Sequence, residues 1–316
     1  MRWGVVVVAA GRGTRFGGPK QFVDIAGRPM LAWSVATFGS MPEVVELVIA
    51  TEPEFVEQAE KIAVEFAPRL VSKVVAGGET RQDSARRAVD ALTGRCSAIL
   101  IHDGARPLVT THDVRACMRE VRDGRGALLA TPAVDTMKVV EPATGKVLRT
   151  LDRAELWSAE TPQCGMAKDV RRAHHDAARH GTSATDDATL LERAGLDVFV
   201  VRGASPNFKV TRPEDRERAA LILQQRPTRL ASEEEILLVE AFVGDPAAEP
   251  VARELESRRG RVDAIDRDLP SAVVVRAYVP AEELRGFGER FAAIAGNDAI
   301  FTTHHAHVAV RPPRGE

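Results

Sequence analysis

VVVVAAGRGTRFGGPKQ, residues 5–21, is the part of the sequence that decides the fold. The four valines Val5–Val8 predict a buried strand. The glycine-rich turn after this strand carries three cations, Arg12, Arg15 and Lys20. Glycines let the backbone approach a phosphate closely, and cations neutralise phosphate charge, so the stretch predicts a phosphate-binding turn.

Other glycine-rich phosphate motifs fit this turn poorly. A P-loop requires Gly-Lys followed directly by Ser or Thr, and this chain lacks that sequence. The dinucleotide-binding fingerprint has a third glycine where this chain has Phe16. A turn without function, merely solvated between a strand and a helix, is the alternative. The Ala-Ala-Gly-x-Gly-x-Arg pattern with a downstream Pro-Lys is more specific than that alternative requires.

The spacing of apolar residues predicts alternating strands and helices through the first two-thirds of the chain. Strands are expected at 44–50, 70–75, 98–102 and 198–201, and helices at 30–38, 81–92, 111–122, 167–179, 187–194 and 213–225. Thr111, which opens one of these helices, is its candidate cap. Strands separated by helices require right-handed crossovers, so the fold class is α/β with a doubly wound, mainly parallel sheet. Such sheets bind ligands at the carboxyl ends of their strands.

Between residues 130 and 162 the pattern changes to short extended pieces with no helix between them. These pieces lie at 137–140 and 146–150, and a Pro-Ala-Thr-Gly turn joins them. The pattern predicts a projecting β-arm at about 133–160.

A second domain is expected beyond a polar linker at 227–234. The pattern there predicts a strand, a helix, two strands, a helix and a strand, at 236–243, 249–259, 261–265, 272–278, 282–295 and 299–310. This β-α-β-β-α-β order is the ferredoxin-like plan. We therefore predict a first domain at 1–226 and a small α+β ferredoxin-like domain at 235–316. The three glutamates 233–235 are interpreted as a solvated charge run beside the linker.

The composition is that of a globular protein with two domains. The chain has 316 residues, 44% hydrophobic and 28% charged, and a formal net charge of -2. This balance gives no overall attraction for polyanions, so nucleic-acid or ribosome binding is not expected. Cys96, Cys117 and Cys164 form no CxxC pair, which argues against a disulfide framework and a zinc site. No stretch approaches the roughly 20 apolar residues that cross a bilayer, so we expect a cytoplasmic protein without membrane contact.

Seven further motifs follow the glycine-rich turn. They are Gly77-Gly78-Glu79-Thr80-Arg81-Gln82-Asp83-Ser84, His102-Asp103-Gly104-Ala105-Arg106-Pro107, Asp135-Thr136-Met137-Lys138, Asp152-Arg153, Thr161-Pro162-Gln163, Thr185-Asp186-Asp187 and Asn207-Phe208-Lys209-Val210-Thr211-Arg212-Pro213-Glu214-Asp215. In this order, and with the turn, they resemble the 2-C-methyl-D-erythritol 4-phosphate cytidylyltransferases of the non-mevalonate isoprenoid pathway. The resemblance covers roughly residues 3–226.

The resemblance implies a Rossmann-like nucleotidyltransferase that transfers CMP from CTP to 2-C-methyl-D-erythritol 4-phosphate and releases pyrophosphate. Catalytic roles are implied for Arg15, Lys20 and Lys209. Nucleotide-binding roles are implied for Ala9, Ala10, Gly11, Gly13, Gly77, Gly78, Ser84 and Asp103. Cations such as Arg15 and Lys20 can stabilise the charge that develops as pyrophosphate leaves. The tight glycine pair at 77–78, with Ser84, is similar to the segment that reads the cytosine ring.

The resemblance also implies substrate-binding roles for Asp103, Arg106, Thr136, Arg153 and Lys209. Two cations around one phosphomonoester make electrostatic sense, and Asp103 can accept hydrogen bonds from polyol hydroxyls. Thr136 and Arg153 fall in the predicted arm, so a homodimer is implied in which each arm completes the partner's site. Mg2+ is expected on the triphosphate, held mostly by phosphate oxygens and water, with Asp103 as the one protein ligand considered.

Structural and functional alternatives remain for this first domain. Ser84 could serve only as a hydroxyl at a helix start. Asp103 and Arg106 could form a structural ion pair, and Lys209 could be an exposed lysine at a strand end. Related enzymes share most of these motifs, so a cytidylyltransferase for ribitol 5-phosphate or another polyol phosphate is the second hypothesis.

The tail resembles a different family. Its matching residues are Ser257-Arg258-Arg259-Gly260-Arg261-Val262, Arg276-Ala277-Tyr278-Val279-Pro280, Glu283-Leu284-Arg285-Gly286-Phe287, Gly296 and His305. They resemble the ferredoxin-like fifth domain of translation elongation factor G over about 235–312. The basic segment expected after the second helix is missing at 289–296, so an assembly or regulatory module is preferred, and a ribosome-associated binding protein is the alternative. Side chains alternate along a strand, so His304, His305 and His307 indicate an exposed final strand rather than a metal site.

Overall fold

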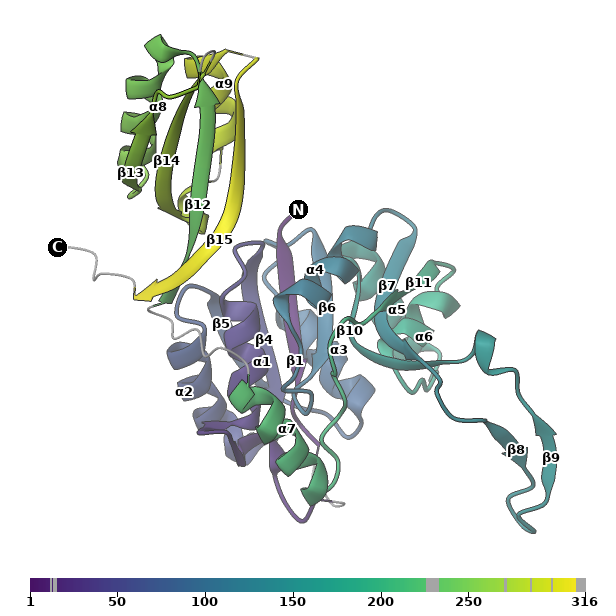
Figure 1. Cartoon of the computed structure of the whole chain (residues 1–316). Helices are drawn as coiled ribbons and strands as arrows, with labels where there is room; N and C mark the ends of the chain where they lie inside the picture. Colours follow the sequence, from purple (N-terminus) through teal and green to yellow (C-terminus); the bar gives the residue numbers. More distant parts are fainter. Residues whose placement is uncertain are drawn as a thin grey trace. The chain divides into compact units, whose positions relative to one another are not determined.

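The computed structural model describes residues 1–11, 13, 16–225, 233–269, 272–284, 286–296 and 298–310. The chain divides into two compact units, Met1–Arg226 and Pro227–Glu316 (Figure 1). Most of the predicted linker lies outside the described residues. Its last two residues, Glu233 and Glu234, belong to the first strand of the second unit and not to a linker. Glu235, the last residue of the predicted charge run, lies in the same strand.

A seven-stranded sheet forms the centre of the first unit. Its strands lie in the order β11 (Asp197–Arg202), β7 (Arg125–Pro132), β10 (Trp157–Met166), β6 (Ala98–Asp103), β1 (Trp3–Val8), β4 (Val44–Thr51) and β5 (Val71–Ala76). The pairs of β10 with β6 and with β7 are antiparallel, and the other neighbouring pairs are parallel. The predicted α/β fold with a mainly parallel sheet is confirmed.

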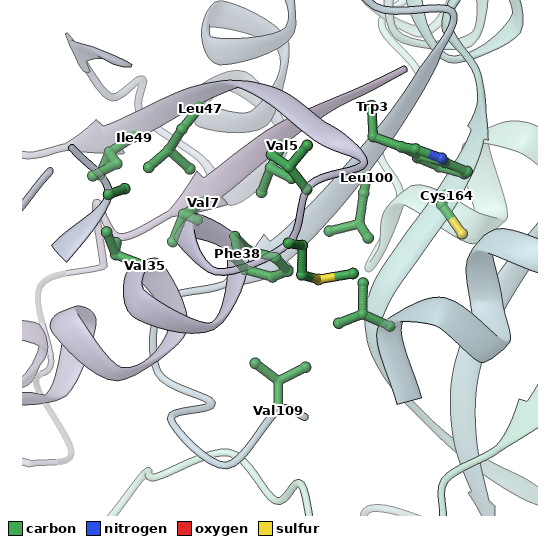
Figure 2. Close-up of a cluster of buried hydrophobic side chains, with 14 of the residues drawn as sticks. Trp3, Val5, Val7, Val35, Phe38, Leu47, Ile49, Leu100, Val109 and Cys164 are labelled. Carbon is green, nitrogen blue, oxygen red and sulfur yellow. The ribbon is translucent and has the colours of Figure 1, made fainter. Parts of the chain in front are cut away.

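Helices cover both faces of this sheet. One face carries α1 (Met30–Gly39), α2 (Val56–Phe66) and α4 (Thr111–Glu120), and the other carries α3 (Arg81–Ala91), α5 (Ala167–Arg179) and α6 (Asp187–Arg193). Every residue of β1 is buried because its side chains alternate between the two cores: Val5 and Val7 enter one core and Val6 the other. Figure 2 shows Val5 and Val7 gathered with Phe38 of α1.

A smaller apolar cluster lies beside the glycine-rich turn. It joins α7 (Pro213–Gln225), through Ala219 and Leu223, to Ile25 and Leu108. Ile25 belongs to a short hairpin of β2 (Asp24–Ile25) and β3 (Arg28–Pro29). This packing anchors the chain that follows the turn.

Several elements differ from the sequence prediction. The sequence pattern predicts no element at α2 or at β7, although α2 buries Ala59, Ile62 and Ala63 on one face. The strand β7 contains leucines and alanines, which are typical of helices as well as buried strands. The cap of α4 is Thr110, whose hydroxyl accepts a hydrogen bond from the backbone N–H of Asp113, and not Thr111.

The predicted arm is present as a separate hairpin. Its strands are β8 (Lys138–Val140) and β9 (Val147–Thr150), which form a two-stranded sheet of their own. Figure 1 shows the hairpin projecting away from the seven-stranded sheet. The arm is shorter than predicted because β10 begins at Trp157, which pairs with Pro132 of β7 at the arm's base.

The second unit is built around a four-stranded antiparallel sheet. Its elements are β12 (Glu233–Val243), α8 (Asp245–Ser257), β13 (Arg261–Asp266), β14 (Val273–Pro280), α9 (Phe287–Ala295) and β15 (Ile300–Val310), with the 3-10 helix η4 (Ala281–Leu284) before α9. The strands lie in the order β13-β14-β12-β15, and neighbours are antiparallel. Val239, Val275 and Phe291 are among the side chains of its own core. The predicted ferredoxin-like order of elements is present.

The remaining sequence features are placed as follows. The three cysteines are free and buried. His304 lies on β15 with an exposed side chain, and the side chains of His305 and His307 are outside the described part of the chain. Within the described ranges, no group of three or more His, Cys, Asp or Glu side chains could hold a metal ion. In the same ranges, no helix is both long enough and apolar enough to cross a membrane.

Candidate active site

A cleft of ≈ 440 Å³ opens at the carboxyl edge of the seven-stranded sheet. Val8 at the end of β1, Glu52 after β4, Gly77 after β5 and Asp103 at the end of β6 all line it. The location agrees with the rule that sheets of this class bind ligands at the carboxyl ends of their strands. Lys209, which precedes α7, lines the same cleft.

The glycine-rich turn depends on the backbone of Gly13. This residue has φ +61, and a side chain there would place its Cβ only 1.9 Å from the carbonyl oxygen of Gly18. The carbonyl of Gly13 accepts hydrogen bonds from the backbone N–H groups of Phe16 and Gly17, at 2.8 and 3.0 Å. Only glycine fits this conformation and this close approach. Arg15, the predicted catalytic arginine, lies outside the described residues.

Side chains that follow the turn hold it in place. The amide nitrogen Nε2 of Gln21 donates to the carbonyl oxygens of Ala9 and Gly11, both at 2.7 Å. The ammonium group of Lys20 is buried and donates to the carbonyl oxygen of Val210 at 2.7 Å. Lys20 and Gly11 line the cleft, whereas Ala9 is buried with its carbonyl engaged by Gln21.

The second glycine turn connects β5 to α3 and also requires glycine. A Cβ on Gly77 would lie 2.3 Å from the Cβ of Ala10, so the second glycine turn contacts the start of the first one beside the cleft. The hydroxyl of Ser84 accepts a hydrogen bond from the N–H of Gly78 at 3.0 Å and donates to the carbonyl oxygen of Thr80 at 2.9 Å. Ser84 lines the cleft, but its proton is already used within the turn.

Asp103 lies at the centre of a chain of charged groups. Its Oδ1 contacts Nε of Arg81 and its Oδ2 contacts Nζ of Lys209, both at 2.8 Å. Arg81 continues through Nη2 to Oδ2 of Asp187 at 2.8 Å, and Oδ1 of Asp187 lies 3.2 Å from Nε2 of His174. The cleft thus connects to two almost fully buried side chains on α5 and α6.

Electrostatics keep Asp103 and Arg81 charged. Burial by itself would raise the pKa of Asp103, but the charges of Arg81 and Lys209 outweigh it and hold the pKa well below its usual value. In the same way burial would lower the pKa of Arg81, and the charges of Asp187 and Asp103 raise it instead. Sequence reasoning missed this connection: Arg81 and Asp187 stand in quoted motifs without an assigned role, and His174 carries no signal of its own.

Arg106 holds protein groups rather than lining the cleft. Its guanidinium donates to the carbonyl oxygen of Asn207 at 2.7 Å and approaches Oδ2 of Asp103 only at 4.0 Å. It therefore positions the segment that carries Lys209. The substrate-binding role that the resemblance implies for Arg106 stays a prediction, and the alternative ion pair with Asp103 is long, at 4.0 Å.

A neutral histidine supports the loop after β6. Nε2 of His102 donates to the carbonyl oxygen of Arg106 at 3.1 Å, because a carbonyl oxygen can only accept. In a neutral ring Nδ1 then carries no proton, so it accepts from the hydroxyl of Thr161 at 2.9 Å, and the same hydroxyl accepts from the N–H of Asp103 at 3.1 Å. Burial lowers the pKa of His102 to about 4, in agreement with a neutral ring. The histidine thus fixes both ends of the turn from 103 to 106.

The two predicted arm residues lie away from this cleft. Thr136 and Arg153 are exposed, and Nη1 of Arg153 donates to the carbonyl oxygen of Val134 at 3.2 Å within the arm. Neither is among the residues that line the described cleft of the same chain. The structure therefore brings together Ala10, Gly11, Gly13, Lys20, Gly77, Gly78, Ser84, Asp103 and Lys209 among the predicted site residues.

The doubly wound sheet brings the glycine-rich turn, Lys20 and Lys209 together at its carboxyl edge, although the two lysines come from opposite ends of the domain's sequence. This is the architecture of a nucleotidyltransferase. The family model for 2-C-methyl-D-erythritol 4-phosphate cytidylyltransferase matches residues 4–225. The chain belongs to this family, and it is an enzyme of the cytidylyltransferase class.

Individual relatives agree with this assignment. The 2-C-methyl-D-erythritol 4-phosphate cytidylyltransferase of Halalkalibacterium halodurans is 37% identical over 231 residues, which are 72% of this chain and the whole of that protein. The crystal structure of the enzyme of that name from Thermus thermophilus is 30% identical, with a TM-score of 0.56, and covers 71% of this chain and 100% of that one. The 4-diphosphocytidyl-2C-methyl-D-erythritol synthase of Anaerococcus prevotii is 25% identical, with a TM-score of 0.63, over 71% of this chain and 96% of that one.

Proposed function

We propose that the enzyme transfers CMP from CTP to 2-C-methyl-D-erythritol 4-phosphate, giving 4-diphosphocytidyl-2-C-methyl-D-erythritol and pyrophosphate. The main support is one arrangement in the cleft: Lys20 follows the glycine-rich turn, and Lys209, which contacts Asp103, lines the same cleft. Two lysines in one cavity, from opposite ends of the domain's sequence, suit two phosphate-bearing substrates. The acceptor is named after the relatives, because the geometry alone fits any small polyol phosphate.

In this proposal a phosphate oxygen of the acceptor attacks the α-phosphorus of CTP in line. The new P–O bond forms as the bond to the β-phosphate breaks, and pyrophosphate leaves on the opposite side. Lys20, with Arg15, neutralises the charge of the departing pyrophosphate, while Lys209 orients the acceptor phosphate. A phosphomonoester dianion is a competent nucleophile near neutral pH, so no side chain acts as a general base.

Mg2+ is the expected cofactor, and it would neutralise phosphate charge during transfer. Asp103 is the carboxylate at the centre of the cleft, but both of its oxygens already contact cations, Arg81 and Lys209, at 2.8 Å. Asp103 thus fits Mg2+ only as one ligand among several. Phosphate oxygens and water supply the rest, as is usual for this ion.

We also propose a homodimer in which the arm of each subunit completes the site of the other. The arm carries exposed apolar side chains, and Val134, Met137, Val147 and Leu148 are 81%, 47%, 54% and 59% exposed. Apolar side chains clustered on a projecting hairpin are typical of an interaction surface. In this proposal Arg153 and Thr136 reach the acceptor phosphate of the partner, which explains why they lie away from the cleft of their own chain.

The second unit is proposed to be an assembly or regulatory module. Its resemblance to the fifth domain of elongation factor G supports the fold more than a ribosomal role, because the expected basic segment is missing at 289–296. The family match ends at residue 225, before this unit begins. The transfer reaction is therefore assigned to the first unit.

The decisive experiment supplies CTP with a panel of polyol phosphates and measures pyrophosphate release. We expect turnover with 2-C-methyl-D-erythritol 4-phosphate to exceed that with ribitol 5-phosphate. A preference for ribitol 5-phosphate would replace the proposed acceptor and leave the enzyme class intact. Absence of pyrophosphate release with every acceptor would contradict the proposal as a whole.

A further inference from the structure

The two edges of the second unit's sheet are built differently. The strand order β13-β14-β12-β15 makes β13 and β15 the edge strands (Figure 1). Within its six residues β13 carries Arg261, Asp263 and Asp266, and its pairing with β14 shifts between Val262 and Ala264. Charges and bulges on an edge strand prevent it from pairing with another chain. The edge at β13 is therefore protected.

The edge at β15 lacks most of this protection. The eleven residues 300–310 include no Asp, Glu, Lys, Arg, Pro or Gly. The register with β12 is regular from Ile300 to His305 and shifts only beyond this stretch. Among the residues that the structure describes, β12 is the one strand paired with β15. The outer side of β15 therefore offers its backbone groups to a further strand.

Side chains at the start of β15 are exposed as well. Ile300 is 64% exposed, and Phe242, which lies opposite it on β12, is 37% exposed. Thr302 and Thr303 follow and are also exposed. Thr, Ile and Phe are residues that favour strands. A further strand beside β15 would remove apolar surface from water at this edge.

The chemistry of the edge favours a second copy of this chain as the partner. The strand carries no Lys or Arg, so a nucleic-acid backbone is not a suitable partner. An uncharged strand can pair with its own copy without repulsion, and antiparallel pairing of identical strands has closed two-fold symmetry. The homodimer proposed from the arm would hold two second units in one particle, which raises the effective concentration of one for the other.

We propose that β15 pairs antiparallel with β15 of a second copy, so that the two four-stranded sheets join into one continuous sheet. A two-fold axis normal to a sheet places one residue opposite its own copy. The regular stretch from 300 to 305 would then pair about Thr302 or Thr303, and Thr–Thr is a favourable cross-strand pair in either register. This inference deepens the assembly role proposed for the second unit and rests on it.

Disulfide cross-linking tests the pairing in the full-length chain. Residues directly opposite in an antiparallel pair have Cα atoms about 4.5–5.5 Å apart, which a disulfide can span. The three natural cysteines are buried, so an added cysteine on the edge is the accessible one. We expect mild oxidation to convert either Thr302→Cys or Thr303→Cys into a covalent dimer. Ile300→Cys should not cross-link, because in both registers it lies several residues from its own copy.

Asp263→Cys is the matched control, because Asp263 is exposed on the opposite edge strand. It should stay uncross-linked under the same conditions. Equal cross-linking of all four variants would indicate random collision and would overturn the proposal. Absence of cross-linking in both threonine variants would overturn it too, and would leave an extended segment of another protein as the candidate for this edge.

Sedimentation velocity measures the same contact without a disulfide. Thr302→Lys places a charge on the edge of each copy, so we expect the dissociation constant of self-association to rise by about 10-fold. Asp263→Lys should leave it unchanged. A value equal to that of the wild type in Thr302→Lys would contradict the pairing.

Two comparisons separate this inference from the proposed function. If a chain that ends at Arg226 associates more weakly than the full-length chain, but Thr302→Lys does not, the second unit assembles through another surface, and only the β15 pairing is wrong. Pyrophosphate release is measured on the same samples. Chains that cross-link at Thr302 or Thr303 but release no pyrophosphate with any acceptor would contradict the proposed reaction and leave the pairing intact.

Discussion

Each unit of this protein contains a cluster of charged side chains that includes residues of its sheet, and the two clusters differ in burial. In the first unit Arg81 contacts Asp103 and Asp187, whose side chains are 10% and 4% exposed. In the second unit Arg276 contacts Glu240, and these side chains are 38% and 24% exposed. Similar ion pairs therefore differ in their surroundings. The ion pairs of the first unit lie where strands end at a cleft and are shielded from water, whereas the ion pair of the second unit lies on an open sheet face and is not.

Lys20→Ala should have the largest effect, because it removes a buried cation from the cleft. Its charge matters most when pyrophosphate departs, so we expect kcat to fall by about 100- to 1,000-fold, as for the loss of other transition-state donors. The KM for the acceptor should change much less. Steady-state kinetics measure both values, and a maximal rate equal to that of the wild type would refute the assignment.

Asp187→Asn tests the buried end of the cluster. Removing one partner leaves Arg81 and His174 without their shared carboxylate, and we expect a loss of about 3 kcal/mol in the free energy of unfolding. Urea denaturation gives this value. Asp90→Asn is the matched control, since Asp90 pairs with Arg86 on the surface. If the two variants lose the same stability, burial does not distinguish these pairs.

A pH titration of stability tests the neutral His102. Burial lowers its pKa from 6.5 to about 4 in the folded state, so between these values the unfolded chain binds more protons than the folded chain. Stability is therefore lost as the pH falls from 6.5 towards 4, and this group contributes about 3 kcal/mol of the loss. Urea denaturation at a series of pH values measures it. His102→Asn should show a flatter profile, and identical profiles would show that folding does not shift the pKa of the ring.

Arg276→Met should have the smallest effect. It removes the exposed ion pair with Glu240, and pairs of this kind contribute little because water screens them. We expect an unchanged urea midpoint and unchanged turnover with CTP. A clear loss of turnover in this variant would connect the second unit to catalysis and would remove the contrast between the two clusters.

The main sheet could be predicted because its signals are local. Four successive valines at 5–8 and the glycines after them determine a buried strand and a phosphate turn without help from distant residues. The same holds for Gly77 and Gly78, whose side-chain hydrogens leave room for close backbone contacts. The antiparallel β10 between β6 and β7 could not be predicted, because the pairing of strands depends on the whole sheet.

The site was harder to predict than the fold for a similar reason. Asp103 and Lys209 are assigned through the family resemblance, and the structure joins them at 2.8 Å. The link from Arg81 to Asp187 spans 106 positions in the sequence, so no spacing rule could reveal it.

The reversal of β10 has a consequence for how this enzyme can evolve. The chain leaves the sheet after Pro132 and returns at Trp157, and these two residues are paired with each other. An insertion or deletion between them would lengthen or shorten the hairpin while every strand kept its register. The proposed subunit contact could therefore diversify between lineages without disturbing the geometry of phosphate transfer.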